Sequence, residues 1–203
     1  VTASHTGVAE LFQSAALPVQ RVHVIGVVKA YDTKVGTHTF LTRMPADHPL
    51  AQRMSLLEFG TSPGRQRMVG WCDAVEKGDA LRFHGADDLM INKVDALGAD
   101  STWSGGMLRI ATHYRGPDGT EYRHVPRDDS LRARLEPVYV DLPTWDEDLG
   151  QIRRWSDLPR NARRYLATMM RATFAVAYDG ETWPEPSIEI DNRDLDPPEP
   201  MVR

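Results

Sequence analysis

Cysteine is almost absent from this 203-residue sequence. Its single cysteine, Cys72, cannot form an intramolecular disulfide, which is typical of a reducing compartment. One cysteine also cannot share a zinc ion with a second one, and the seven histidines are scattered without the spacing of metal ligands. We therefore predict that this chain holds no metal ligands of its own.

Long apolar runs and an excess of basic residues are absent as well. No run approaches the roughly 18 apolar residues that span a bilayer, and the first residues lack the charged and apolar regions of a secretory signal. The 24 Lys and Arg residues are outnumbered by 29 Asp and Glu residues, so the broad basic field of general nucleic-acid binders is missing. The composition predicts a cytoplasmic protein that binds no membrane and no nucleic acid.

Strand-like and helix-like segments alternate along the chain. Apolar or β-branched runs bounded by turn residues predict strands at residues 21–31, 89–94, 107–115, 120–125 and 174–178. Sequence pattern predicts helices at 73–84 and 156–173, the second with apolar residues at helical spacing and capped by Ser156 or Asp157. Between residues 32 and 70 the periodicity fades, which favours loops. This order predicts an α/β fold with a mixed sheet and flanking helices.

The two ends of the sequence differ from its centre. The sequence opens at Val1 rather than at methionine, in a small polar segment that is typical of the inside of a longer protein. Residues 184–203 contain five prolines and six acidic residues, a composition that favours an extended or disordered tail. We predict one folded portion over residues 1–183, preceded by a missing N-terminal portion and followed by this tail.

The segment Asn92-Lys93-Val94-Asp95 directly follows a predicted strand. A carboxylate there can accept the N1–H and the exocyclic N2–H₂ of guanine, while a lysine stem covers the face of the purine. Adenine presents the wrong donors to the same carboxylate, so this pair would select guanine. A four-residue match is weak alone, and a simple turn-forming cluster is the alternative interpretation.

A glycine- and arginine-rich segment, Gly60–Arg67, is the second candidate site. Its glycines let backbone N–H groups approach an anion, and Arg65 and Arg67 offer guanidinium forks for carboxylate or phosphate. In an extended segment both arginines point to one side and Gln66 to the other. The alternative is a plain surface turn with solvated arginines. A third candidate is the loop Lys34–Gly36, which directly follows a predicted strand.

These segments, in their order and spacing, resemble the C-terminal half of the adenylosuccinate synthetase family. The similar stretches are VTAS at 1–4, GVVKAYDTKVG at 26–36, EFGTSPGRQRMVGWCDAV at 58–75, NKVDAL at 92–97, LEPVYVDLPTWDEDLG at 135–150 and WSDLPRNARRYL at 155–166. The resemblance implies the C-terminal half of a P-loop-related α/β fold. It also implies a GTP-dependent ligase of purine biosynthesis, in which IMP is phosphorylated on its 6-oxygen and the amine of L-aspartate displaces the phosphate.

The family is homodimeric and uses Mg²⁺, and its phosphate loop, catalytic base and general acid belong to an N-terminal half that this sequence does not contain. The resemblance therefore implies no catalytic residue and no metal ligand in this chain, and no ligase activity of the chain alone. The chain is then either a fragment of a full enzyme or a subunit that works beside another chain. The implied substrate-binding positions are Thr2, Val35, Gly36, Thr61, Ser62, Gly64, Arg65 and Arg67, and the implied GTP-binding positions are Arg67, Lys93, Val94 and Asp95.

Each role is carried over by resemblance alone. Thr2 matches a threonine that contacts phosphate, and Val35 and Gly36 match the loop beside the IMP ribose. Arg65 matches an arginine that bridges this ribose and aspartate, and Arg67 matches one that lies near aspartate and GTP. Lys93, Val94 and Asp95 match a guanine-binding segment, 93–95, in which Lys93 and Asp95 recognise the base.

The sequence also departs from the family pattern. Ser62 and Pro63 stand where the family has two threonines, and Pro63 has lost a hydroxyl and a backbone N–H that could bind aspartate. The C-terminal Gly-Pro-Asp-Arg element that helps to hold guanine has only Asp179-Gly180 as its nearest remnant. Two alternatives therefore stay open: a phage-type synthetase that joins aspartate to dGMP, and a non-catalytic nucleotide-binding remnant.

Overall fold

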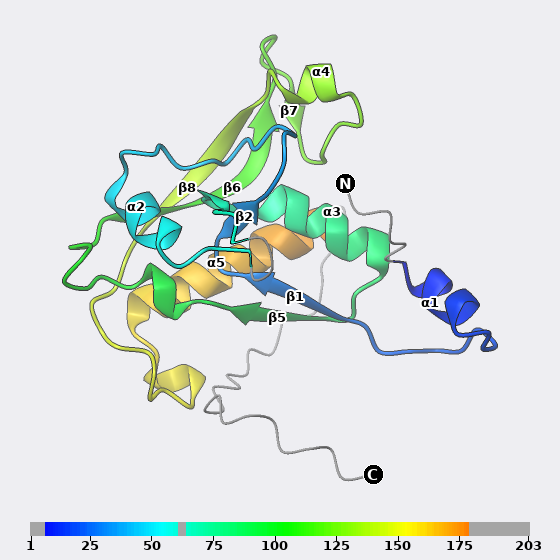
Figure 1. The fold of residues 1–203 in the computed structure, drawn as a ribbon, viewed down its shortest axis with the longest axis horizontal. Helices are drawn as coiled ribbons and strands as arrows, with labels where there is room; N and C mark the ends of the chain where they lie inside the picture. The colour runs from blue at the N-terminus through cyan, green and yellow to red at the C-terminus, as the bar shows by residue number, and fades with distance from the viewer. Residues whose placement is uncertain (1–6, 61–63, 179–203) are drawn as a thin grey trace.

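The computed structural model describes residues 7–60 and 64–178 (Figure 1). Its helices are α1 Val8–Ser14, α2 Pro49–Ser55, α3 Ala74–His84, α4 Asp129–Arg132 and α5 Arg160–Ala177, with 3₁₀ turns at Asp95–Leu97 and Trp155–Asp157. Its strands are β1 Ile25–Lys29, β2 Asp32–Lys34, β3 Met68–Gly70, β4 Cys72–Asp73, β5 Asp88–Asn92, β6 Met107–Arg115, β7 Glu121–Tyr122 and β8 Glu136–Pro143. The predicted α/β class is confirmed.

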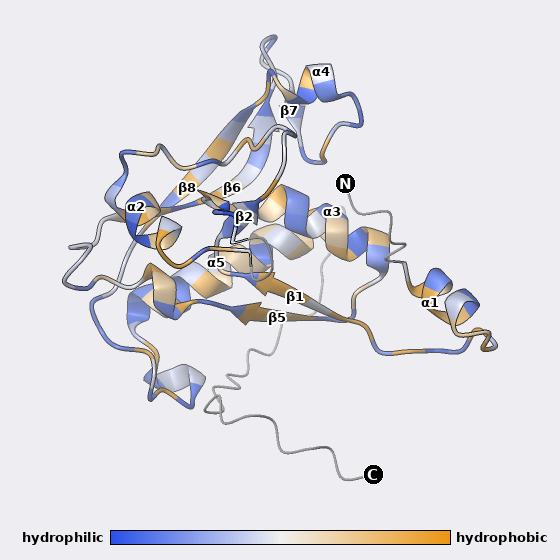
Figure 2. Ribbon diagram, in the orientation of Figure 1, coloured by the Kyte–Doolittle hydropathy of each residue, from blue (hydrophilic) through white to orange (hydrophobic). Residues whose placement is uncertain are grey.

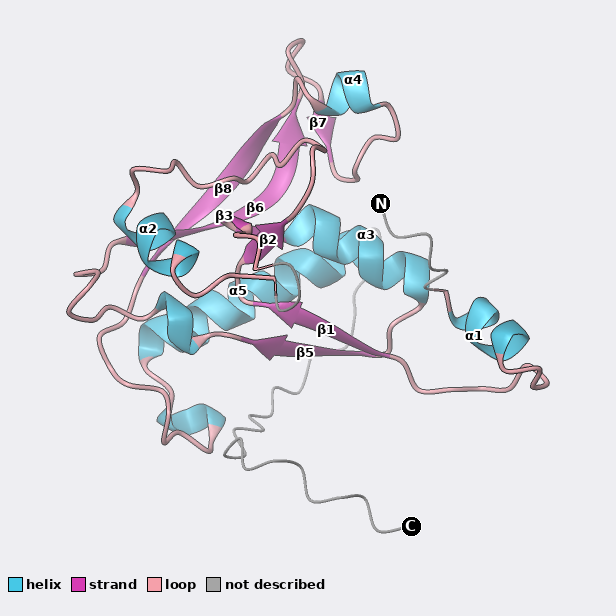
Figure 3. Cartoon of the chain, viewed as in Figure 1, coloured by secondary structure: helices cyan, strands magenta, loops and turns pink. Residues whose placement is uncertain are grey.

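Parallel and antiparallel strand pairs occur together, as predicted for a mixed sheet. β1 and β5 pair in parallel, β2 and β3 pair antiparallel, and β6 is the centre of a four-stranded sheet. In that sheet β6 lies parallel to β4 and antiparallel to β7 and β8. Helices α3 and α5 lie side by side between this sheet and the β1–β5 pair (Figure 3).

Helix α3 begins and ends with well-defined caps. The Asp73 carboxylate accepts the backbone N–H groups of Val75 and Glu76, and Gly85 closes the helix in the left-handed conformation with φ 61°. Gly78, which reduces helix propensity, faces α5. A Cβ atom at Gly78 would lie 2.5 Å from Cβ of Val176. The glycine therefore allows the close approach of α3 and α5.

Three predicted elements differ from the structure. Residues 174–178 are not a strand, because α5 continues to Ala177 and buries Phe174 beside Leu81 of α3. The helix begins at Arg160 after Pro159 without a side-chain cap, since Trp155–Asp157 form a separate 3₁₀ turn. The span 32–70 is not all loop, because it contains β2, α2 and β3.

The predicted strand at residues 21–31 is shorter and less buried than expected. β1 covers only Ile25–Lys29, and Ile25 and Val27 are 51% and 62% exposed. Met90, opposite Val27 in the parallel register, is 50% exposed. Figure 2 shows both strands in the hydrophobic colours. The predicted tail at residues 184–203 lies outside the described residues.

Candidate functional site

The 93–95 segment follows β5 directly, as predicted. Lys93 adopts a left-handed backbone conformation with φ 60°, and Asp95 opens the 3₁₀ turn that follows. A residue with a Cβ atom adopts this conformation at a cost of about 1–2 kcal/mol, and such strain concentrates at functional sites. Lys93 and Asp95 are exposed, whereas Ala96 and Leu97 anchor the turn in the core.

Two polar side chains hold the backbone just after Asp95. The Thr144 hydroxyl donates to the Leu97 carbonyl at 2.6 Å, and Arg53 Nη1 donates to the Gly98 carbonyl at 2.7 Å. Both bonds fix the 3₁₀ turn from elements far away in the sequence. The backbone next to the exposed Asp95 is therefore held in place by hydrogen bonds from two other segments of the chain.

The Gly60–Arg67 segment belongs to a small antiparallel hairpin in which Glu58–Gly60 pair with Arg65–Arg67. The Arg67 N–H donates to the Glu58 carbonyl at 2.9 Å, and the Gly60 N–H donates to the Arg65 carbonyl at 2.8 Å. Gly64 has φ 61°, a conformation that favours glycine. Thr61, Ser62 and Pro63 lie outside the described residues, as does Thr2.

Side chains of the hairpin alternate between its two faces. Arg67 Nη1 donates to Glu58 Oε2 at 3.3 Å, whereas Gln66 Nε2 donates to the Ser55 carbonyl at 3.2 Å. Arg65, two residues before Arg67, is exposed. Gln66 and Arg67 thus have different partners, as expected where neighbouring residues of an extended strand point to opposite faces. The direction of the Arg65 side chain stays a prediction.

Glu58 is the centre of a buried polar cluster that sequence analysis missed. Its side chain is 5% exposed. Lys29 Nζ donates to Oε1 at 2.7 Å and to Oε2 at 2.8 Å, and the Tyr31 hydroxyl donates to Oε1 at 2.5 Å. Burial favours the neutral acid, but hydrogen bonds from Lys29 and Tyr31 and the charges of Lys29 and Arg67 hold the pKa of Glu58 below its usual value.

Tyr31 lies within electrostatic range of two predicted site residues. Burial, the hydrogen bond to Glu58 and the negative charges of Glu58 and Asp95 raise the pKa of Tyr31, while the positive charge of Arg67 opposes the rise. The structure thus brings the 93–95 segment and the hairpin toward one buried cluster. The signal available in the sequence was an acidic residue, Glu58, two residues before the glycine-rich segment.

The loop that contains Val35 and Gly36 is attached to the same cluster. Lys29 Nζ donates to Thr33 Oγ1 at 3.2 Å, two residues before Val35. Val35 is exposed, and Gly36 has φ 103°. Lys34 Nζ donates to the Thr39 carbonyl at 2.8 Å and so closes this loop.

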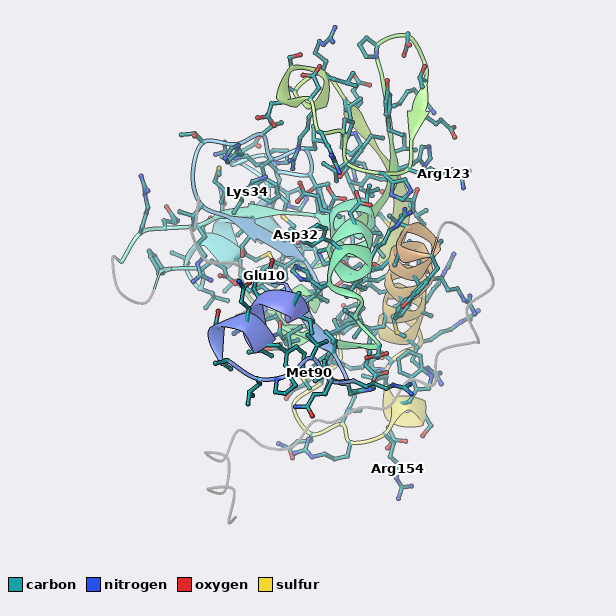
Figure 4. The ribbon with its side chains drawn as sticks, turned by 90° about the vertical axis from the view of Figure 1, so that its right-hand side faces the viewer. Glu10, Asp32, Lys34, Met90, Arg123 and Arg154 are labelled. Atoms are coloured by element: carbon teal, nitrogen blue, oxygen red, sulfur yellow. The ribbon has the colours of Figure 1, made fainter. Side chains whose placement is uncertain are left out.

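A second buried cluster lies between β2 and α3 (Figure 4). The Lys77 ammonium contacts Asp32 Oδ2 at 2.6 Å, and the same oxygen accepts the Asp73 backbone N–H at 2.6 Å. The Tyr114 hydroxyl donates to Asp73 at 2.8 Å. Burial, with the charges of Glu76 and Asp32, raises the pKa of Asp73 to about 7. These contacts connect α3 to β2 through Asp32, and connect the start of α3 to β6 through Tyr114.

Within residues 7–60 and 64–178, no group of three His, Cys, Asp or Glu side chains is placed to hold a metal ion. No helix in the same ranges is long and apolar enough to cross a membrane. Cys72 is buried, and its burial raises the pKa of the thiol to about 12, which disfavours the nucleophilic thiolate.

Comparison with known proteins relates this geometry to one family. Residues 1–177 match the family model described as adenylosuccinate synthetase. An adenylosuccinate synthetase of Desulforamulus reducens is 37% identical over 174 residues, which are 85% of this chain and 39% of that protein. One of Brevibacillus brevis is 41% identical over 157 residues, which are 75% of this chain and 35% of that protein.

A solved structure shares the fold. The fully ligated adenylosuccinate synthetase of Plasmodium falciparum superposes with a TM-score of 0.74 at 26% identity, over 85% of this chain and 41% of that chain. The present chain therefore spans about two fifths of the length of the relatives that it matches.

Proposed function

Because the chain belongs to the adenylosuccinate synthetase family, we propose that it supplies nucleotide- and aspartate-binding residues to a GTP-dependent ligase of purine biosynthesis. This ligase joins L-aspartate to IMP and forms adenylosuccinate. The observation that carries the proposal is the family match over residues 1–177. All the relatives described above are adenylosuccinate synthetases, which favours IMP over dGMP as the nucleotide substrate.

In this proposal the Asp95 carboxylate accepts the N1–H and N2–H₂ groups of guanine, and the Lys93 stem covers the base, with Val94 between them. The strained backbone of Lys93 and the rigid turn after Asp95 support this role. Because a carboxylate offers only acceptors, it discriminates against adenine, which presents an acceptor at N1.

The proposed roles of the hairpin concern the anionic substrates. Arg65 contacts the IMP ribose and aspartate, and Arg67 contacts aspartate and GTP. Thr61, Ser62 and Gly64 line the same substrate site, and Thr2 contacts phosphate. Guanidinium groups suit these ligands because their forked donors match carboxylate and phosphate oxygens. Val35 and Gly36 lie beside the ribose.

The chemistry itself requires groups that we place outside this chain. Residues 7–60 and 64–178 offer no ligand cluster for the expected Mg²⁺, and we propose that its ligands lie in the part of the family's length that this chain does not span. The catalytic acid and base belong to the same part. Homodimer formation and a cytoplasmic location remain predictions.

Nucleotide binding by the 203-residue chain tests the proposed guanine site. We expect calorimetric titration to give tighter binding of GTP than of ATP, and Asp95→Asn to remove this preference. A hydrogen bond to a charged acceptor contributes roughly 1.5–3 kcal/mol, so the loss is on the order of ten- to a hundredfold per bond. Asp118→Asn, in a distant exposed turn, is the matched control. Unchanged GTP preference in Asp95→Asn would contradict the assignment.

Activity measurements test the reaction. We expect the isolated chain to form no adenylosuccinate from IMP, aspartate and GTP, because a general base must lie within hydrogen-bond reach of its proton. We expect adenylosuccinate to form once the family's N-terminal portion is present, either in one longer chain or as a separate chain beside this one. Turnover with dGMP in place of IMP would support the alternative phage-type activity, and no turnover with either nucleotide would support a binding remnant.

A further inference from the structure

The buried carboxylate of Glu58 contacts Arg67, which is one of the proposed substrate-binding arginines. Glu58 and Arg67 face each other across the hairpin, joined by the backbone bond from the Arg67 N–H to the Glu58 carbonyl and by the side-chain contact at 3.3 Å. The Glu58 side chain is almost fully buried, whereas the Arg67 side chain is partly exposed. The guanidinium therefore lies between a fixed internal anion and the solvent side of the hairpin.

The orientation of the carboxylate is itself fixed by other segments. Lys29 at the end of β1 contacts both oxygens, and Tyr31 occupies Oε1. Oε2, which accepts from Lys29, also accepts from Arg67 Nη1. Among the described residues this is the one hydrogen bond that the Arg67 side chain makes, and a guanidinium has five N–H donors. The remaining donors can then be directed toward a bound anion.

The charges of the cluster suit the same role. Lys29 and Arg67 contribute two positive charges and Glu58 one negative charge, and the Tyr31 hydroxyl is neutral. Glu58 cannot neutralise both cations, so the partly exposed Arg67 can also bind an external anion.

We propose that Glu58 is a positioning residue that sets the direction of the Arg67 guanidinium, and that Lys29 and Tyr31 set the direction of Glu58. The inference rests on the proposed function for the role of Arg67 toward aspartate and GTP. The positioning of Arg67 by Glu58 stands on the geometry of this chain.

The first test needs no substrate. In the ¹⁵N-labelled 203-residue chain, NMR of the arginine Nε–Hε groups reports how firmly each guanidinium is held. We expect Glu58→Gln to release Arg67, seen as a lowered order parameter and faster exchange of its Nε–Hε proton. Gln66→Leu, on the opposite face of the same hairpin, is the matched control and should leave this signal unchanged. An unchanged Arg67 signal in folded Glu58→Gln would overturn the positioning role.

The second test uses a double-mutant cycle in the natural protein that carries this chain. We expect Glu58→Gln to raise the KM for aspartate about tenfold with little change in kcat, as for the loss of one charge-assisted hydrogen bond. Arg67→Leu should raise it at least as much, and the double variant no further, because Glu58 acts through Arg67. Additive effects would show that Glu58 acts independently of Arg67, contrary to the inference.

Two outcomes separate this inference from the proposed function. If the wild-type protein neither binds GTP nor uses aspartate, the proposed function fails, while the NMR measurement still decides whether Glu58 holds Arg67. If Glu58→Gln does not fold, Tyr31→Phe removes a single hydrogen bond from Oε1. It should produce the same changes in the Arg67 signal and in the aspartate KM at a smaller size, and no change in either would overturn the inference.

Discussion

The four-stranded sheet and the β1–β5 pair bury their apolar residues to very different extents. Leu108, Ile110 and Tyr114 of β6 are fully buried. In the β1–β5 pair, Val27 and Met90 lie opposite each other with about half or more of each side chain exposed. Parallel strands are usually covered on both faces; within the described residues this pair packs on one face against the core to which α3 and α5 contribute. Apolar strand sequences therefore do not by themselves determine burial; the neighbouring elements do.

The largest expected effect lies in the four-stranded sheet. Ile110→Ala removes a fully buried side chain from β6 and should lower the free energy of unfolding by about 2–5 kcal/mol, since it loses apolar burial and leaves a cavity. Urea denaturation monitored by tryptophan fluorescence measures the change. A loss below about 1 kcal/mol would show that the sheet is less tightly packed than its burial indicates.

A smaller loss is expected where α3 and α5 meet, between the two sheets. Gly78→Ala places a methyl group 2.5 Å from Cβ of Val176 and 2.6 Å from the Thr173 carbonyl. This overlap should outweigh the gain in helix propensity and cost about 1–3 kcal/mol. Gly119 lies in an exposed turn of the β6–β7 hairpin and has a positive φ, with no atom within 4 Å of an added Cβ. Gly119→Ser therefore measures the cost of a side chain at a left-handed position without steric overlap. Stabilisation by Gly78→Ala would contradict the close helix approach.

The pH dependence of stability should depend on Asp73. Its pKa is raised to about 7 in the folded chain by burial and by the charges of Glu76 and Asp32. The folded state therefore holds a proton between about pH 4 and pH 7 that the unfolded state releases. This contribution is fully present below pH 4 and is lost as the pH rises toward 7, by up to about 1.4 kcal/mol per pH unit.

Asp73→Asn should remove this dependence while it keeps an N-cap side chain on α3. Urea denaturation of both proteins at several pH values between 4 and 7 gives the two slopes. Equal slopes in the two proteins would mean that Asp73 does not titrate in this range in the folded chain.

The smallest effect is expected on the exposed face of the β1–β5 pair. Val27→Ala removes a side chain that is 62% exposed and should change the free energy of unfolding of the 203-residue chain by about 0.5 kcal/mol or less. Val28→Ala, on the covered face of the same strand, is the matched comparison and should cost more. Equal losses would show that both faces are buried in solution, which would remove the contrast between the two sheets.

Local sequence was sufficient wherever the information lies within a few residues. The helix over most of Arg160–Ala177, the strand before Asn92 and the hairpin around Gly116–Gly119 follow from apolar spacing and turn residues. The alternation of Gln66 and Arg67 follows from the two-residue period of extended backbone. The placement of Lys93 and Asp95 directly after a strand was also predicted, because the strand pattern and the motif are adjacent in the sequence.

Only the tertiary structure decided which residues surround the candidate site. Lys29, Tyr31 and Glu58 converge across separations of 27 and 29 residues, and a contact between distant residues leaves no periodic pattern in a single sequence. The same holds for residues 174–178, whose β-branched and aromatic composition favoured a strand, until the packing of Phe174 beside Leu81 kept them helical. Local propensity differs by tenths of a kcal/mol per residue, up to about 1 kcal/mol, whereas burying one large apolar side chain contributes about 1.5–3 kcal/mol, so the packing prevailed.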